Sequence, residues 1–537
     1  MRGGTEGSPA RARAPAGARH PTPGRRSRSV ARHNSRSRAL RAPGRRPHAR
    51  RWEDCHVSDA PSLDLISRAQ RTRVAVVGGG VAGLVAAWEC ARVGMPVTLF
   101  EAAGRLGGTL ETDTLDGIAL DPVADAFPLG SATLRALIDE VGLSDRIEPA
   151  AAETVAVATA GGSRLTTLPP NLAGIPANTW DVPVRRLVGW RGVWRAYLDR
   201  LRPPLTIGRQ HSLGALVRTR MGERVRDRLV APLSTGLYGV DPDVVDADLA
   251  VPGLNAALTR AGSLSGAVAQ LLPEADGARR GTLRGGLGTL VPALADLLRD
   301  RGVELRTGVS VTALHPSGAG WDLSVASDPV DEDRDEDIRT FSADVVVLAC
   351  GADATRALTG EAGVRIAPSA PTMRDVVTLV TDAAPGSATG SQPAIVAPLP
   401  GSSPAALLTD AAAMWPSVAE AAGAARRVLR VALVVDGADA PPDDVTAAIA
   451  HDAAVALLGA SALGSVRAAV RRRVRLDAPA SVLGHAARRD EARAEIARRA
   501  GLVAVGAWLS GGGIAAVAAD TAAEVDRMRR GVLFGSA

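Results

Sequence analysis

Short apolar runs alternate with predicted helices along most of this chain. Four runs are apolar almost throughout, which is typical of strands buried on both faces of a parallel sheet: residues 74–77, 96–100, 343–349 and 502–506. Three stretches predict helices: residues 84–92, 131–141 and 514–529. Strands that alternate with helices predict an α/β fold.

The pattern changes between these elements. Residues 180–201 and 213–230 predict Arg-studded helices, and residues 376–435 contain strand candidates separated by Pro- and Gly-rich turns. Within the latter region, the repeated prolines of residues 383–409 predict a loop region. The acidic run 328–337 predicts a solvated hairpin loop.

We therefore predict two domains, both of them discontinuous in sequence. Residues 70–127, 281–355 and 495–537 would form a Rossmann-like nucleotide-binding domain. Residues 128–280 and 356–494 would form a second, substrate-binding domain with a mixed sheet and a helical insertion.

The composition at the N-terminus predicts that residues 1–69 form a disordered, Arg-rich tail. Residues 1–56 hold 15 Arg against three acidic residues and almost no apolar ones, so they cannot form a core. This segment suits an RNA- or membrane-binding arm or a transit peptide. We expect it instead to be dispensable or to precede the authentic start, because Val57-Ser58-Asp59-Ala60 is typical of a bacterial start of translation.

Charge and composition exclude several classes of protein. Residues 57–537 contain 48 Arg and 54 acidic residues, so no nucleic-acid partner is expected. Three widely spaced Cys and scattered His indicate neither disulfides nor a metal site. The sequence shows no secretion signal and no membrane-spanning segment, so we expect a cytoplasmic protein; peripheral membrane contact and the oligomeric state stay open.

The strongest motif follows the first apolar run. Gly78, Gly80 and Gly83 form a G-x-G-x-x-G turn, and the helix that begins near Val81 directs free N–H groups toward a bound phosphate. Glu101 ends the next strand about 20 residues on, where a carboxylate can bind both ribose hydroxyls of an adenosine. A lone glycine motif is common, but the full strand, turn, helix, strand and acid indicate a dinucleotide.

Gly104-Arg105-Leu106-Gly107-Gly108 resembles the second motif of two-dinucleotide-binding-domain flavoproteins, which favours bound FAD over NAD. From residue 72 onward the chain resembles the flavin-dependent porphyrinogen oxidases of the amine oxidase superfamily. The resemblance rests on four further segments: residues 163–176 (SRLTTLPP to GIP), 232–242 (PLSTGLYGVDP), 283–290 (LRGGLGTL) and 506–514 (GAWLSGGGI).

This resemblance implies a set of FAD contacts. Glu101 would bind the ribose, Arg105 and Gly108 the pyrophosphate, Val311 the adenine, and Gly513 with Ile514 the flavin. The implied cofactor-binding residues are Gly78, Gly80, Val81, Ala82, Gly83, Glu101, Ala102, Arg105, Gly107, Gly108, Val311, Gly506, Gly513 and Ile514.

The chain departs from the family pattern at four places. Val123 replaces a usual glycine, Gly351 a usual proline, and Asp520-Thr521 a usual Ser-Gly pair. The arginine that often follows the Ala126-Phe127 pair is missing. Two of these changes, Val123 and the missing arginine, lie near the expected flavin and substrate, so they bear on the substrate more than on the cofactor.

The resemblance implies oxidation of coproporphyrinogen III to coproporphyrin III by dioxygen in haem biosynthesis, through hydride loss to the flavin. No catalytic acid or base is required or identified. The alternatives are a protoporphyrinogen IX oxidase, a carotenoid desaturase or other flavoenzyme of the superfamily, and a non-catalytic flavin-binding relative. A polyamine oxidase is disfavoured, because those enzymes commonly use a lysine and this chain has none. The arginines of residues 180–228 are the expected partners of the substrate carboxylates.

Overall fold

The structure is a computed structural model that describes residues 60–159, 164–202, 211–272, 279–327, 339–367, 372–384, 393–434 and 441–535. Residues 59–537 belong to one compact unit. The predictions for most of the tail and for the acidic run 328–337 concern residues outside the described ranges.

A five-stranded parallel sheet takes its strands from the beginning, the middle and the end of the chain. In spatial order the strands are β12 (Glu304–Thr307), β2 (Val97–Glu101), β1 (Val74–Val77), β16 (Val345–Leu348) and β22 (Leu502–Ala504). Every neighbouring pair is parallel. The predicted α/β class and the apolar runs are thereby confirmed.

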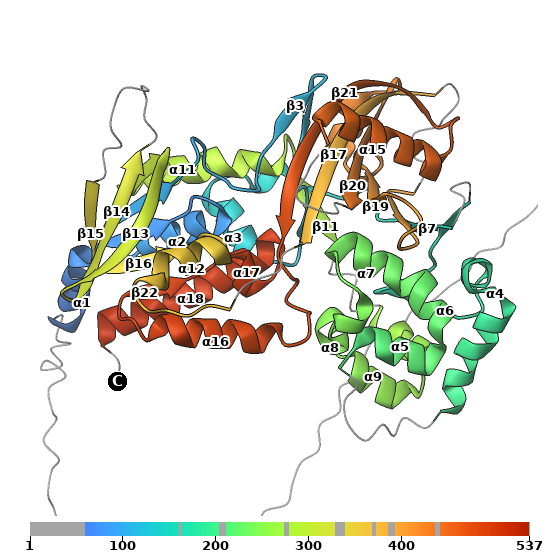
Figure 1. Cartoon of the computed structure of the whole chain (residues 1–537), viewed down its shortest axis with the longest axis horizontal. Coiled ribbons are helices and arrows are strands. Elements are labelled where there is room, and N and C mark those ends of the chain that lie inside the picture. Colours follow the sequence, from blue (N-terminus) through green and yellow to red (C-terminus); the bar gives the residue numbers. More distant parts are fainter. Residues whose placement is uncertain are drawn as a thin grey trace, which may run out of the picture. The chain divides into compact units, whose positions relative to one another are not determined.

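Alternate residues along these strands contribute to two different hydrophobic cores. Val74, Val76 and Val347 pack with helices α2 (Val81–Ala91), α3 (Ala132–Glu140), α11 (Leu290–Asp300) and α18 (Ile514–Phe534). Ala75 and Val77 instead pack with α16 (His485–Ala497) and with the antiparallel sheet of β13 (Val309–Ser317), β14 (Gly320–Ser327) and β15 (Arg339–Ala343). Figure 1 shows this smaller sheet beside α12 (Ala352–Gly360).

A second, seven-stranded sheet is mixed. Its order is β21 (Leu463–Leu476), β17 (Thr372–Ala383), β20 (Arg426–Val434), β19 (Ala405–Asp410), β18 (Ile395–Pro398), β7 (Val155–Ala158) and β8 (Leu165–Thr167). Only the β18–β7 pair of this sheet is parallel. Val377 and Leu379 face helix α15 (Asp443–Leu458), so the alternate residues Arg374, Val376 and Thr378 lie on the opposite face, here called the inner face.

Short helices follow the first part of this sheet, as the Arg-studded segments predict. They are α4 (Val182–Tyr197), α5 (Leu213–Met221), α6 (Glu223–Val225), α7 (Ala231–Tyr238), α8 (Ala247–Ala250), α9 (Leu254–Ala261) and α10 (Leu264–Leu271). Figure 1 shows them in green, gathered together. Their apolar side chains form a separate core that also includes Val157 and Ala397 of the sheet.

The remaining elements are short. They are the hairpin β3 (Asp113–Leu115) and β4 (Ile118–Leu120), the set β5 (Phe127–Pro128), β6 (Ile147–Pro149) and β11 (Arg280–Leu283), the pair β9 (Asn171–Leu172) and β10 (Ile175–Pro176), and helices α13 (Ala411–Met414), α14 (Pro416–Ala422) and α17 (Ala507–Ser510).

Two sequence-based predictions differ from the structure. Residues 60–69, assigned to the disordered tail, belong to helix α1 (Ala60–Arg71), where Ala69 is buried and Arg68 donates a 2.7 Å hydrogen bond to the carbonyl of Leu533. The predicted loop 383–409 contains the fully buried strand β18 and part of β19. Pro398 and Pro404 stand at strand ends, where proline costs no ladder hydrogen bond.

Candidate functional site

The turn between β1 and α2 packs so closely that two of its glycines have no room for a side chain. A Cβ on Gly78, whose φ is 109°, would stand 2.7 Å from the carbonyl oxygen of Ala349. One on Gly83 would stand 1.8 Å from the carbonyl oxygen of Gly78. At Gly80 no atom lies within 4 Å of an added Cβ. The turn therefore packs tightly at Gly78 and Gly83, whereas Gly80 presents bare backbone to open space, as the motif predicts.

Glu101 is anchored on this turn. Its Oε2 accepts a hydrogen bond from the backbone N–H of Gly79 at 2.6 Å, and its Oε1 accepts one from the N–H of Ala103 at 2.9 Å. The carboxylate thus lies beside the turn at the end of β2, where a ribose-binding acid is expected. It also fixes the conformation of the turn, which the sequence pattern did not predict.

The segment after β2 returns to the same turn. The N–H of Gly107 donates to the carbonyl of Gly79 at 2.8 Å, and a Cβ on Gly108 would stand 3.3 Å from the Cα of Gly80. Arg105 lies at the surface, where its guanidinium contacts Glu111 at 3.1 Å. The structure brings the two glycines to the turn, whereas phosphate binding by Arg105 stays a prediction.

A cavity of about 490 Å³, here called the turn cavity, lies at the carboxyl ends of β1, β16 and β22. Six of the predicted cofactor residues line it: Gly80, Val81, Ala82, Gly506, Gly513 and Ile514. The other eight do not: Gly78, Gly83, Glu101, Ala102, Arg105, Gly107, Gly108 and Val311. The carboxyl edge of a parallel sheet is where ligands bind in open α/β folds.

The lining of the turn cavity suits a dinucleotide. An added Cβ would meet open space at Gly80, Gly351 and Gly513, so bare backbone faces the cavity at three places. Helix α18 begins at its edge, with Gly513 as the N-cap, and helix N-termini attract anionic groups. Gly351, at the position of the usual proline, is the N-cap of α12 in the same way.

Three buried polar atoms at this cavity lack a hydrogen-bond partner among the described residues. Nε and one terminal nitrogen of Arg475, and Oδ1 of Asp477, are buried without a hydrogen bond in the described part of the chain. Nε and Oδ1 are 3.7 Å apart, too far to bond each other. Burial raises the pKa of Asp477, although Arg475 opposes this shift. Groups of this kind are normally satisfied by water or a ligand.

Two further cavities adjoin the turn cavity. One of about 130 Å³, here called the sheet cavity, lies on the inner face of the seven-stranded sheet and shares Val123 and Leu476 with the turn cavity. The other, of about 450 Å³ and here called the flank cavity, shares Asp125 with the turn cavity and Arg430 with the sheet cavity. Val123, which replaces the usual glycine, thus lies between the turn and sheet cavities.

Arg430 and Asp125 form an ion pair where the three cavities meet. The guanidinium NH2 lies 2.7 Å from Oδ2 of Asp125, and both side chains are 17% exposed. NH1 also donates to the carbonyl oxygens of Asp121 and Val123 at 3.4 and 3.3 Å. One arginine of β20 thereby holds the segment that separates the cavities.

Arg374 faces the sheet cavity from β17. The residue is 6% exposed, and its NH2 donates to the carbonyl oxygen of Thr235, in α7, at 3.0 Å. Burial lowers its pKa. Within the described ranges no carboxylate forms an ion pair with it, although most other buried arginines have one.

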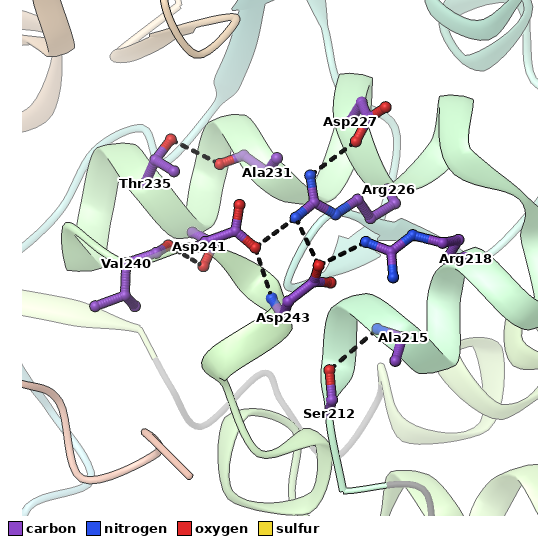
Figure 2. A network of polar contacts seen from close by, with 11 residues as sticks. Ser212, Ala215, Arg218, Arg226, Asp227, Ala231, Thr235, Val240, Asp241 and Asp243 are labelled. Atoms are coloured by element: carbon purple, nitrogen blue, oxygen red, sulfur yellow. Dashed lines mark hydrogen bonds and ion pairs between the residues drawn. The ribbon is translucent and has the colours of Figure 1, made fainter.

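The arginines of the helical region are engaged elsewhere. Figure 2 shows Arg226 between Asp241 and Asp227, while Arg218 contacts Asp243 at 2.5 Å. Burial opposes the charge of Arg226, but its carboxylate hydrogen bonds outweigh burial and raise its pKa. This network fixes the Tyr238–Pro242 passage that resembles the porphyrinogen oxidases. None of the helical arginines lines the three cavities, so their positions do not support a role in binding substrate carboxylates.

Sequence reasoning did not single out Arg374, Arg430, Asp125 or Arg475. The available signal was an arginine inside an apolar strand pattern, as in Thr372-Met-Arg-Asp-Val-Val-Thr-Leu-Val. A charged residue at an inward strand position is costly unless it is paired or functional.

Among the described residues, no cluster of three or more His, Cys, Asp or Glu is arranged to hold a metal ion. In the same ranges no helix has both the length and the apolar character needed to cross a bilayer.

Comparisons with known proteins agree with this site. Residues 81–382 match the family model described as flavin containing amine oxidoreductase, and residues 34–119 match that of pyridine nucleotide-disulphide oxidoreductase. A crystal structure from Exiguobacterium sp. 255-15, named as a candidate protoporphyrinogen oxidase, superposes with a TM-score of 0.74 over 86% of this chain and 99% of that one at 22% identity. At this identity the likeness shows the fold.

Two curated relatives carry the same name, coproporphyrinogen III oxidase. The protein from Propionibacterium freudenreichii is 30% identical over 55% of this chain and 59% of its own length. The protein from Mycobacterium bovis is 34% identical over 51% of this chain and 58% of its own length. The chain thus matches less than two thirds of the length of either relative.

Proposed function

The chain belongs to the flavin-containing amine oxidoreductases, with FAD as cofactor, and on that premise we propose that it oxidises coproporphyrinogen III to coproporphyrin III with dioxygen. The names of the two curated relatives support this substrate. The proposed partners are the porphyrinogen and dioxygen, and we propose a cytoplasmic location on the grounds of the sequence.

We propose that the turn cavity holds the pyrophosphate and the flavin of FAD. Gly80, Val81 and Ala82 would receive the pyrophosphate at the start of α2, with Gly107 and Gly108 beside them. Gly513 and Ile514 would face the flavin at the start of α18. Glu101 would bind the ribose and Val311 the adenine. Bound FAD would accept a hydride from a meso carbon of the porphyrinogen and pass the electrons to dioxygen.

The residues around the sheet cavity would bind and orient the substrate. Val123, Leu237, Val376, Leu407 and Leu476 give this cavity an apolar lining, which suits an edge of a flat tetrapyrrole. The cavity shares two of these residues with the turn cavity, so a macrocycle edge placed here would adjoin the flavin. This adjacency is the observation that carries the proposal.

The proposed division into domains follows the strands. The three segments 70–127, 281–355 and 495–537 supply all five strands of the parallel sheet, and the seven-stranded sheet comes from residues 128–280 and 356–494. On this proposal the substrate would bind where the two sets of strands meet.

One experiment tests the function. The purified yellow protein is mixed without oxygen with coproporphyrinogen III, protoporphyrinogen IX, spermine or phytoene, and bleaching of the flavin is followed. Bleaching by coproporphyrinogen III, with peroxide released once air is admitted, supports the proposal. Bleaching only by protoporphyrinogen IX would change the substrate, bleaching only by phytoene or spermine would indicate another flavoenzyme, and no bleaching at all would indicate a non-catalytic relative.

A further inference from the structure

Arg374 is a buried cation that no carboxylate of the described residues neutralises. Its residue exposure is 6%, and its hydrogen-bond partner is a neutral carbonyl, that of Thr235. A buried arginine without a carboxylate costs folding energy. The neighbouring strand position behaves differently, because Asp375, on the opposite face, contacts both Arg471 and Arg473 at 3.0 Å.

The surroundings of Arg374 are those of a binding site. It lines the sheet cavity together with apolar side chains and with Arg430, whose charge Asp125 balances at 2.7 Å. Arg374 is therefore the cation of this cavity that lacks a carboxylate within the described residues. A carboxylate that enters the cavity could form an ion pair with the guanidinium of Arg374, which can donate two parallel hydrogen bonds.

The size of the sheet cavity limits what can enter. Its volume is about 130 Å³, against about 490 Å³ for the turn cavity. This smaller space suits a short carboxyalkyl arm at the edge of a macrocycle. Arg374 and Arg430 stand on adjacent strands of the inner face, four residues apart in register, or roughly 13 Å along the sheet.

We infer that Arg374 receives one carboxylate arm of the substrate and so fixes which edge of the macrocycle faces the flavin. The inference rests on the proposed function for the identity of the macrocycle. It assigns to β17 the role that the sequence placed on the helical arginines, whose guanidinium groups contact residues of their own region. The residue is a binding and positioning group and takes no part in proton transfer.

The test compares Arg374→Met with the wild-type holoprotein. Binding of coproporphyrin III and of its tetramethyl ester is measured from the flavin spectrum, together with the melting temperature. We expect the variant to bind the acid about 10- to 100-fold more weakly and the ester within about three-fold of wild type, since one charge-assisted contact is lost. Because an uncompensated charge is removed, the melting temperature should stay equal or rise.

The control is Arg467→Met, since Arg467 lies at the exposed end of β21, pairs with Asp116 and does not line the sheet cavity. It should bind the acid as the wild type does. Equal affinity of the acid for Arg374→Met and wild type would overturn the inference. A lower melting temperature with unchanged affinity would overturn it too, because it would show a structural role.

A second variant covers the case in which Arg374→Met does not fold. The chain contains no lysine, so Arg374→Lys carries the single side-chain amine of the protein. Coproporphyrin III should slow acetylation of that amine at least about five-fold, read by intact mass, whereas the tetramethyl ester should not. Equal rates with and without the acid would overturn the inference. A wild type that binds the acid but oxidises no porphyrinogen would refute the proposed reaction and leave the carboxylate contact standing.

Discussion

Arg430 on β20 and Asp125, just ahead of β5, form a 2.7 Å ion pair at the junction of the three cavities. Arg430 belongs to the seven-stranded sheet, whereas Asp125 lies in the loop between β4 and β5, and each side chain is 17% exposed. The pair therefore ties the wall of the turn cavity to the inner face of the seven-stranded sheet.

The two side chains of this pair should contribute to stability jointly, so the effects of removing them should not add. We expect Asp125→Asn or Arg430→Met to lower the free energy of unfolding by about 1–3 kcal/mol, with the double variant less affected than the sum. Urea unfolding of the holoprotein measures both quantities. The exposed pair Arg299–Asp296 is the control and should show a coupling of at most about 0.5 kcal/mol. Additive effects at the first pair would contradict the prediction.

Gly80 and Gly83 should respond differently to alanine. Gly80→Ala should fold normally, because its Cβ meets open space, but should raise the Kd for FAD at least about ten-fold by filling the front of the turn. Gly83→Ala should unfold or lose several degrees of melting temperature, because its Cβ would overlap the carbonyl of Gly78. Flavin fluorescence and thermal melts of the apoproteins separate the two. Retention of FAD by Gly80→Ala would mean that the turn does not contact the cofactor.

Glu101→Gln tests whether the carboxylate holds the turn. Both carboxylate oxygens of Glu101 accept a hydrogen bond, one from the N–H of Gly79 and one from the N–H of Ala103. Glutamine has one acceptor oxygen, and its NH2 group cannot accept, so one of these two bonds is lost. We expect FAD affinity to fall about ten-fold and the free energy of unfolding to fall by about 1 kcal/mol. Glu304→Gln, on the neighbouring strand β12, is the exposed control. If both variants keep FAD equally well, Glu101 has no special part in the site.

Truncation should distinguish the tail from helix α1. A chain that begins at Val57 keeps α1 and should bind FAD and melt like the full chain. A chain that begins at Thr72 loses α1, with the buried Ala69 and the bond from Arg68 to Leu533, and should melt several degrees lower. Equal melting temperatures for the two shortened chains would show that α1 adds nothing to the fold.

Acid should weaken the β17–β21 pairing through Asp375. Burial alone would raise the pKa of this carboxyl, but hydrogen bonds from Arg473 and Arg471 outweigh it and lower the pKa. The charged form therefore contributes stability that is fully present above the pKa of the unfolded chain, near 3.9, and is lost as pH falls through the lower folded value. Asp375→Asn should remove this part of the acid dependence, measured by urea unfolding between pH 6 and 3. Asp443→Asn, the exposed partner of Arg471, should retain it.

The parts of the site that the sequence predicts are local. Gly78, Gly80, Gly83 and Glu101 stand within one strand–helix–strand unit, so spacing alone predicts their arrangement, and the structure confirms the turn packing. The strand β18 escaped prediction because prolines were interpreted as loop residues, although Pro398 ends the strand. Helix α1 differs from the prediction because the Arg-rich, apolar-poor composition of residues 1–56 does not continue into residues 60–69.

The substrate side could not be predicted because its contacts are long-range. Asp125 meets Arg430, and Arg374 meets the carbonyl of Thr235, only after the sheets have formed. In a chain with so many arginines, no spacing marks the few whose guanidinium groups face a cavity. The alternation of β17 and β20 places Arg374 and Arg430 on the inner face, but it places Arg426 there too, so only the position of the sheet cavity distinguishes the first two.

The order of strands in the parallel sheet also constrains synthesis on the ribosome. Its edge strand, Leu502–Ala504, and the glycines that follow it at the turn cavity are translated after every other strand of this sheet. A nascent chain consequently exposes one edge of β16 until residues 502–504 emerge from the ribosome, and it cannot complete the proposed FAD site before then. A chain that stops before residue 502 would therefore lack part of the proposed cofactor site.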